Sequence, residues 1–172
     1  NRIGTTYVYE WDGNDWTQLG QDIIGEAFDD QSGYSVSLNS DGLVVAIGAH
    51  RNDGNGNNSG HARVYQYSSG SWTQLGEDID GEASYDNSGY SVSLSSDGTI
   101  VAIGAYSNNG NGNNSGHVRV YKYIGTSWIQ LGEDIDGEAN LDISGISVSL
   151  SDDGNIVAIG APWNDNNGAD SG

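Results

Sequence analysis

A repeat of 56 residues constrains this sequence more than any other feature. Trp16, Trp72 and Trp128 lie one such step apart, and the segment at residues 33–88 matches the next one, residues 89–144, at about three quarters of its positions. No insertion or deletion interrupts the period. Self-similarity at this length is typical of propellers and solenoids, in which each unit buries its apolar face against its neighbour.

Each unit predicts four short strands and no helix. The strands are expected to begin near Gly33 (GYSVSL), Leu43 (LVVAIGA), His61 (HARVYQY) and Trp72. The first pattern alternates, the second is continuously apolar, and glycine-rich turns separate them. The sequence therefore predicts an all-β fold of four-stranded antiparallel blades in tandem, a β-propeller or a fragment of one, with an exact 56-residue repeat.

Composition excludes some partners and leaves others open. Acidic residues outnumber basic ones 24 to 5, for a formal net charge of −19. This charge repels phosphates and argues against a nucleic-acid partner. It is explained by solubility in a salty medium or by cation binding. The chain has no cysteine for a disulfide or a thiolate metal site, and we see no apolar run long enough for membrane insertion.

The repeated motifs resemble those of a known family. The order GYSVSL, DG, VAIGA, a Gly/Asn loop and GHVRVY is similar to the FG-GAP repeat of integrin α-subunit propellers and related surface proteins. Gly160-Ala161-Pro162 matches the Gly-Ala-Pro element in full, whereas Gly48-Ala49 and Gly104-Ala105 keep two of its three residues. Ser-Gly stands in place of Phe-Gly. The resemblance implies a propeller whose strands run A to D within each blade.

The family's strand order divides the chain into four parts. Residues 1–32 are expected to form a half blade of strands C and D, residues 33–88 and 89–144 each a complete blade with its connector, and residues 145–172 a half blade of strands A and B with a loop. Propellers usually close with four to eight blades. The expected partners are therefore further blades of a longer parent chain, which we favour, or identical copies, in a ring or an open filament.

Two places could bind calcium. The resemblance implies a calcium loop, but the family's Asp-x-Asp-x-Asp-Gly is reduced here to Ser40-Asp41-Gly42 and its equivalents, so that site is expected to be lost. The second place is the Gly/Asn loop, where Asp53, Asn55 and Asn57 alternate as oxygen ligands would. Its next copy has Asn109 in place of Asp53, which also makes it compatible with a solvated turn. We expect no required cofactor, with calcium as the one candidate.

Further candidates recur with the same period. Asn57 and Asn113 each begin an Asn-x-Ser glycosylation motif, although such triplets arise by chance in an Asn-rich chain. Trp16, Trp72 and Trp128 could stack on sugars or pack between blades, and we expect packing. Arg63 and Arg119 are expected to contact a ring or the nearby acidic segment. The three histidines are expected at loop edges.

The function expected from these features is not catalytic. Catalysis needs one asymmetric constellation, whereas nearly every polar residue here recurs in the next unit. We expect a structural or adhesive component of a cell-surface or secreted assembly, including a filamentous one. The alternative is a propeller that binds a carbohydrate, in the manner of a lectin, or a surface protein. A third reading is the inert scaffold of a larger enzyme.

Overall fold

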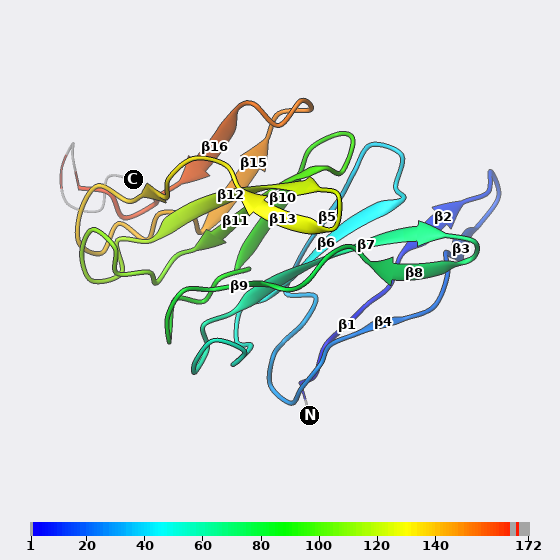
Figure 1. The fold of residues 1–172 in the computed structure, drawn as a ribbon, viewed down its shortest axis with the longest axis horizontal. Helices are drawn as coiled ribbons and strands as arrows, with labels where there is room; N and C mark the ends of the chain where they lie inside the picture. The colour runs from blue at the N-terminus through cyan, green and yellow to red at the C-terminus, as the bar shows by residue number, and fades with distance from the viewer. Residues whose placement is uncertain (1, 166–167, 169–172) are drawn as a thin grey trace.

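The computed structural model describes residues 2–165 and 168, which form sixteen β-strands and no helix. Two complete antiparallel sheets make up its centre (Figure 1). Sheet 1 consists of β5 (Ser35–Leu38), β6 (Val44–Ala49), β7 (His61–Ser68) and β8 (Ser71–Gln74), with β9 (Ile79–Asp80) beside β7. Sheet 2 consists of β10 (Ser91–Leu94), β11 (Ile100–Ala105), β12 (His117–Ile124) and β13 (Ser127–Gln130), with β14 (Ile135–Asp136) beside β12.

A half-sheet flanks this centre on each side. The N-terminal half-sheet contains two pairs, β1 (Thr5–Thr6) with β4 (Ile23–Ile24) and β2 (Tyr9–Trp11) with β3 (Trp16–Gln18). The C-terminal half-sheet pairs β15 (Ser147–Leu150) with β16 (Val157–Gly160). The all-β, antiparallel prediction is thus confirmed, and the four strands expected in the unit at residues 33–88 begin within two residues of their predicted positions.

Two apolar layers join consecutive sheets. One lies between sheets 1 and 2, where Val44, Ala46 and Val64 meet Val92 and Leu94. The other lies between the N-terminal half-sheet and sheet 1. It consists of Val8, Ile23, Val45, Ile47 and Trp72. Strand β6 therefore contributes to both layers with alternate residues, and all six of its residues are buried. This explains why its sequence is continuously apolar rather than alternating.

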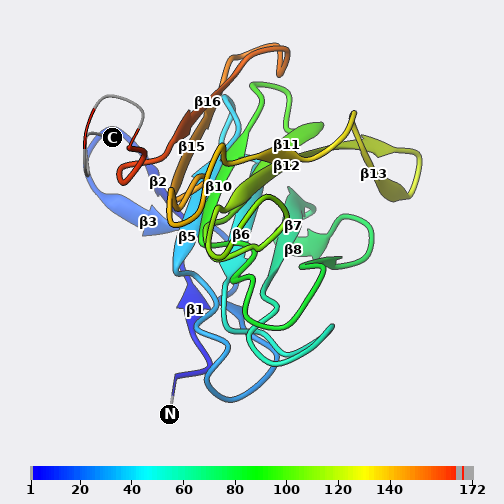
Figure 2. The same ribbon diagram turned by 90° about the vertical axis from the view of Figure 1, so that its left-hand side faces the viewer.

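The first strands of successive units lie side by side. Figure 2 shows β5, β10 and β15 next to one another near the middle of the molecule. The hydroxyl of Ser35 donates to the carbonyl of Gly89 (2.8 Å), and that of Ser91 donates to Gly145 (2.8 Å). The serines that alternate with apolar residues in these strands thus hold one repeat to the next.

A glycine in β6 allows this close approach. The α-carbon of Gly48 lies so close to Gly89 that an added β-carbon would be 1.9 Å from the Gly89 carbonyl oxygen. Gly104 meets Gly145 in the same way, at 2.0 Å. Any side chain would push the sheets apart. The Gly-Ala element at the end of this strand therefore has a packing role.

Candidate functional site

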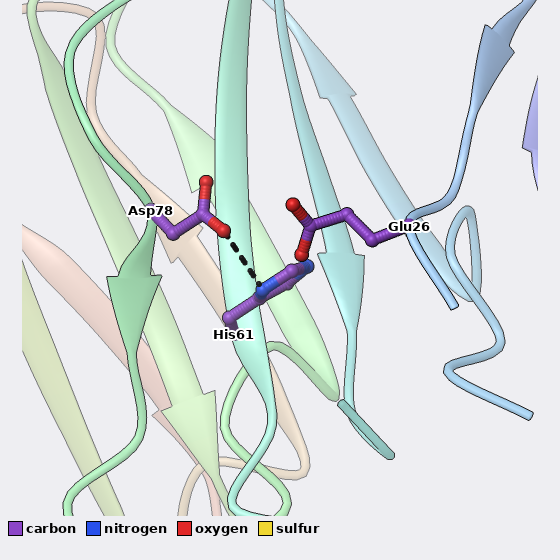
Figure 3. Close-up of side chains that lie close together, drawn as sticks. All are labelled: Glu26, His61 and Asp78. Carbon is purple, nitrogen blue, oxygen red and sulfur yellow. Dashed lines mark ion pairs between the residues drawn. The ribbon is translucent and has the colours of Figure 1, made fainter. Parts of the chain in front are cut away.

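Histidine, arginine and carboxylate side chains gather where one repeat meets the next. His61 and Arg63 lie in the first half of β7, and Asp78 precedes β9, which pairs with β7. Glu26 comes from the connector of the preceding unit, and Figure 3 shows it approaching His61 from the side opposite Asp78. We call Glu26, His61, Arg63 and Asp78 the first polar cluster. It links two units that are separate in sequence.

Ion pairs hold the first polar cluster together. The guanidinium of Arg63 contacts Glu26 through Nη2 (2.6 Å to Oε2) and Asp78 through Nε (3.4 Å to Oδ1). The Nδ1 atom of His61 lies 3.5 Å from Asp78 Oδ2, with no hydrogen bond formed. His61 is 2% exposed. Arginine is therefore the residue that joins the two carboxylates.

The same arrangement recurs 56 residues later. The second polar cluster consists of Glu82, His117, Arg119 and Asp134. The Arg119 guanidinium donates two parallel hydrogen bonds of 2.8 Å to the Asp134 carboxylate and also pairs with Glu82. His117 Nδ1 lies 3.6 Å from Asp134 Oδ2 and, like that of His61, has no hydrogen-bond partner. Bidentate pairing makes this copy the more tightly bonded one.

Burial keeps both histidines neutral. Desolvation lowers the pKa of His61 and of His117 below the usual value of 6.5, and it outweighs the attraction of the nearby carboxylates. The hydrogen bonds from Arg119 lower the pKa of Asp134. Burial alone would lower the pKa of Arg119, but its bonds to Asp134 and Glu82 raise it. The second polar cluster is therefore a charged arginine between two carboxylates, beside a neutral imidazole.

The donor set of each cluster must be tested as a metal site. A histidine nitrogen and two carboxylate oxygens lie within 4.8 Å of one another in both copies, and these are the two groups of this kind among the described residues. Such a set suits zinc. The arginine, however, already pairs with both carboxylates and supplies the positive charge that a cation would bring. The geometry thus supports an ion-pair link between repeats rather than a metal centre.

The residues predicted to bind calcium in the Gly/Asn loop make hydrogen bonds that shape the loop. The Asp53 carboxylate accepts from the backbone N–H of Asn58 (2.7 Å), and Asn109 accepts equivalently from Asn114 (2.8 Å). This role needs an acceptor but no charge, which explains the exchange of Asp for Asn. The side-chain amide of Asn55 donates to the carbonyls of residues 81 and 82, and that of Asn57 donates to the Tyr85 hydroxyl.

The reduced calcium-loop positions also serve as local caps. The Asp41 carboxylate accepts from the N–H of Leu43 (2.9 Å), and Asp97 and Asp153 repeat the contact with Thr99 and Asn155. Bonds from Ser151 and Asn155 lower the pKa of Asp153 to about 2. One carboxylate on a tight turn closes that turn, and the two metal-compatible groups are elsewhere.

The glycosylation motifs lie on exposed loops. Asn57 and Asn113 are exposed, whereas the serines two residues later, Ser59 and Ser115, are fully buried. The hydroxyl of Ser59 is 3.3 Å from both the Asn52 carbonyl and the Asn55 N–H. These serines therefore shape the folded loop, and glycosylation at the two asparagines stays a prediction.

The tryptophans pack between repeats, as predicted. Trp72 is 4% exposed, and its indole N–H donates to the carbonyl of Leu19 in the preceding unit (2.8 Å). Trp128 makes the same bond to Leu75 (2.7 Å). Trp16 is 62% exposed. The same residue type is thus covered wherever a preceding repeat is present.

Sequence reasoning missed the two polar clusters. It placed the histidines at loop edges, but His61 and His117 are the first residues of β7 and β12 and are buried. It did anticipate that Arg63 and Arg119 would meet the acidic segment. The available signal was a histidine and an arginine at alternate positions of a strand, repeated with the period of 56.

The chain is similar to known proteins in two ways. Residues 25–65 and 79–121 match the FG-GAP repeat family, which confirms the resemblance. A crystal structure of a proposed 6-phosphogluconolactonase from Bacteroides fragilis superposes with a TM-score of 0.57 at 12% identity, over 92% of this chain. The chain spans 37% of that protein's length. We found no match among curated protein sequences.

Proposed function

Taking the two FG-GAP repeats as a premise, we propose that this chain is a non-catalytic module, a structural or adhesive component of a cell-surface or secreted assembly. One observation carries the proposal. The residue types that could perform chemistry, His61, Arg63 and their carboxylate partners, are engaged in contacts between consecutive repeats and recur unchanged in type in the next repeat. FG-GAP repeats are also typical of extracellular proteins.

The charge and the loops fit this role. A net charge of −19 keeps a large repeated surface hydrated and limits its collapse onto other acidic surfaces. Among the described residues, none forms a helix long and apolar enough to cross a membrane. An assembly role therefore depends on contacts between protein surfaces or on segments beyond these repeats.

The lectin alternative depends on exposed aromatic side chains. Trp11 and Trp16 are 51% and 62% exposed, with ring centroids 5.6 Å apart, and they could stack on a sugar. Their equivalents in the next unit, Tyr67 and Trp72, form the same ring pair (5.2 Å) inside the apolar layer. The assembly role accounts for the exposed pair as a face that another repeat covers.

Catalysis by a larger enzyme is the third alternative. The likeness to the Bacteroides fragilis protein supports a shared fold and, at 12% identity, carries no activity over to this chain. A reaction centre would need one set of residues that differs between repeats, and the two polar clusters are alike.

Fractionation of the source cells tests the proposal. Antibody against the purified chain should detect the native protein in the envelope or the medium, in particles much larger than 18.1 kDa. Detection as a small soluble species inside the cells would contradict it. A glycan array separates the lectin alternative: binding that is lost in Trp16→Ala but kept in wild type would favour carbohydrate recognition.

A further inference from the structure

The two half-sheets are complementary parts of one four-stranded sheet. By the 56-residue period, β15 and β16 correspond to β5 and β6, whereas β1 to β4 correspond to β7, β8 and β9. Within residues 2–165 and 168, β16 pairs with β15 alone, whereas β6 and β11 each have a second neighbour, β7 and β12. Strands β1 and β2 likewise lack the partner that β7 finds in β6. The half-sheets lie at opposite ends of the row (Figure 1).

We propose that β16 of one copy pairs antiparallel with β1 and β2 of a second copy, so that the two half-sheets form a complete sheet between chains. Unpaired edge strands are templates for this kind of addition. The register follows from β6 and β7, where Val44 lies opposite Gln66 and Val45 opposite Tyr65. Applied to the half-sheets, it places Ile156 opposite Glu10 of the second copy.

The outer half of each sheet carries matching exposed groups. Leu131 and Ile135 are 41% and 40% exposed and border a recess of about 270 Å³, whereas Ile79, the equivalent of Ile135, is 5% exposed. On the other end, Trp16 is exposed because the contact that Trp72 makes with Leu19 is missing. Strand pairing brings Trp16 of the second copy onto Leu131, with its indole N–H at the Leu131 carbonyl.

The inner half shows a second matching set. A β-carbon at Gly98 would lie 2.8 Å from Val44, and one at Gly154 would lie 2.6 Å from Ile100. The equivalent Gly42 has nothing within 4 Å. Ile156, the equivalent of Val44 and Ile100, is 69% exposed. The same pairing places Ile156 of one copy on Gly42 of the other.

Strand β5 completes this inner set. Val36 and Leu38 are 55% and 49% exposed, while their equivalents Val92 and Leu94 are 8% and 7% exposed under the preceding unit. The exposed positions at one end are thus those that the interface inside the chain buries, and so are those at the other end. The proposed contact continues an interface that this chain already makes twice.

The occupant that fits both ends is another copy of this chain. Head-to-tail contacts either close into a ring or continue as a filament. Each copy holds two complete sheets and two half-sheets, so that two copies would form six sheets, within the four to eight of propellers. The inference deepens the proposed structural role, but fractionation tests that role without depending on this contact.

Sedimentation of the purified chain tests the pairing. We expect a species of about twice 18.1 kDa, or longer polymers, that dissociates on dilution. Ile156→Glu should raise the dissociation constant at least about tenfold, because a charge replaces an apolar side chain at the contact. Phe28→Glu is the matched control, since Phe28 is 68% exposed outside both half-sheets. A monomer at all concentrations, or equal effects of the two variants, would overturn the proposal.

Disulfide trapping tests the register. The chain has no cysteine, so that a variant with Glu10→Cys and Ile156→Cys contains a single new pair. Directly opposed residues in antiparallel strands are close enough to form a disulfide. We expect oxidation to link copies efficiently. The control carries Thr17→Cys with Ile156→Cys, because Thr17 lies one strand further away. Equal linking in both variants would reject the register.

Discussion

The side-chain amide of Asn52 donates a 3.0 Å hydrogen bond to the carboxylate of Asp30, and both residues are buried. Asp30 lies in the connector before β5, whereas Asn52 follows β6. The carboxylate also accepts from the N–H of Ala27 (3.1 Å), which closes the connector on itself. The relationship recurs at 3.0 Å between Asn108 and Asp86 and between Asn164 and Asp142. Each unit therefore fastens its connector to its own Gly/Asn loop.

Asp30→Ala should lower the free energy of unfolding by about 1–3 kcal/mol, because it leaves a buried amide without an acceptor. Urea denaturation followed by tryptophan fluorescence measures this change. Glu77→Ala is the control, since Glu77 is exposed, and it should stay within about 0.5 kcal/mol of wild type. Equal losses in the two variants would show that the buried bond has no special role.

Gly48→Ala should destabilise the chain by about 1–3 kcal/mol, because the new methyl group would collide with the backbone of Gly89. Gly160→Ala is the matched control. Its β-carbon would meet the hydroxyl of Ser147 at 2.3 Å, a side-chain group that can rotate away. Thermal denaturation should therefore separate the two variants, and a similar melting temperature for both would contradict the proposed contact between repeats.

Arg119→Ala should destabilise the chain and create a zinc site. Without the guanidinium, Glu82 and Asp134 repel each other beside His117, and the three ligand atoms become available to a cation. We expect zinc to raise the melting temperature of the variant but not that of wild type. Stabilisation of wild type by zinc at equal concentration would favour a native metal centre instead.

Stability should fall as the pH decreases from about 6.5 to 4. Burial lowers the pKa of His50 to about 4, and it also lowers that of His61 and His117. The unfolded chain therefore binds more protons in this range, so that the stability present above pH 6.5 is lost as the pH falls. Asp80 acts in the opposite direction, because burial raises its pKa.

Melting temperatures between pH 7.5 and 4 measure this loss. In His50→Tyr, which installs the residue that the next repeat has at Tyr106, the decline should be shallower. An unchanged slope would exclude His50 as a contributor.

Asp53→Asn should leave stability within about 0.5 kcal/mol of wild type. The amide oxygen can accept the bond from Asn58, as Asn109 does for Asn114 in the next unit. Asp53→Ala removes the acceptor and should cost about 1 kcal/mol. Thermal scans with calcium and with a chelator complete the test, since a calcium-dependent rise in wild type that Asp53→Asn abolishes would establish the predicted calcium site.

The sequence by itself determined the repeat and its strands. The alternation in GYSVSL and the continuous apolar run of LVVAIGA predict β5 and β6 because side chains in a strand point to opposite faces. The period of 56 then carries the prediction to β10 and β11. Local pattern is sufficient here, because strand formation and turn chemistry depend on residues close together in the chain.

Only the tertiary structure decided what meets across the repeats. Glu26 and His61 are 35 positions apart, and nothing local in the sequence indicates that they share a cluster. The collision predicted at Gly48 depends on the backbone of Gly89, and the exposure of Ile156 depends on which neighbour covers it. These properties arise from packing between units, which a single unit's sequence does not encode.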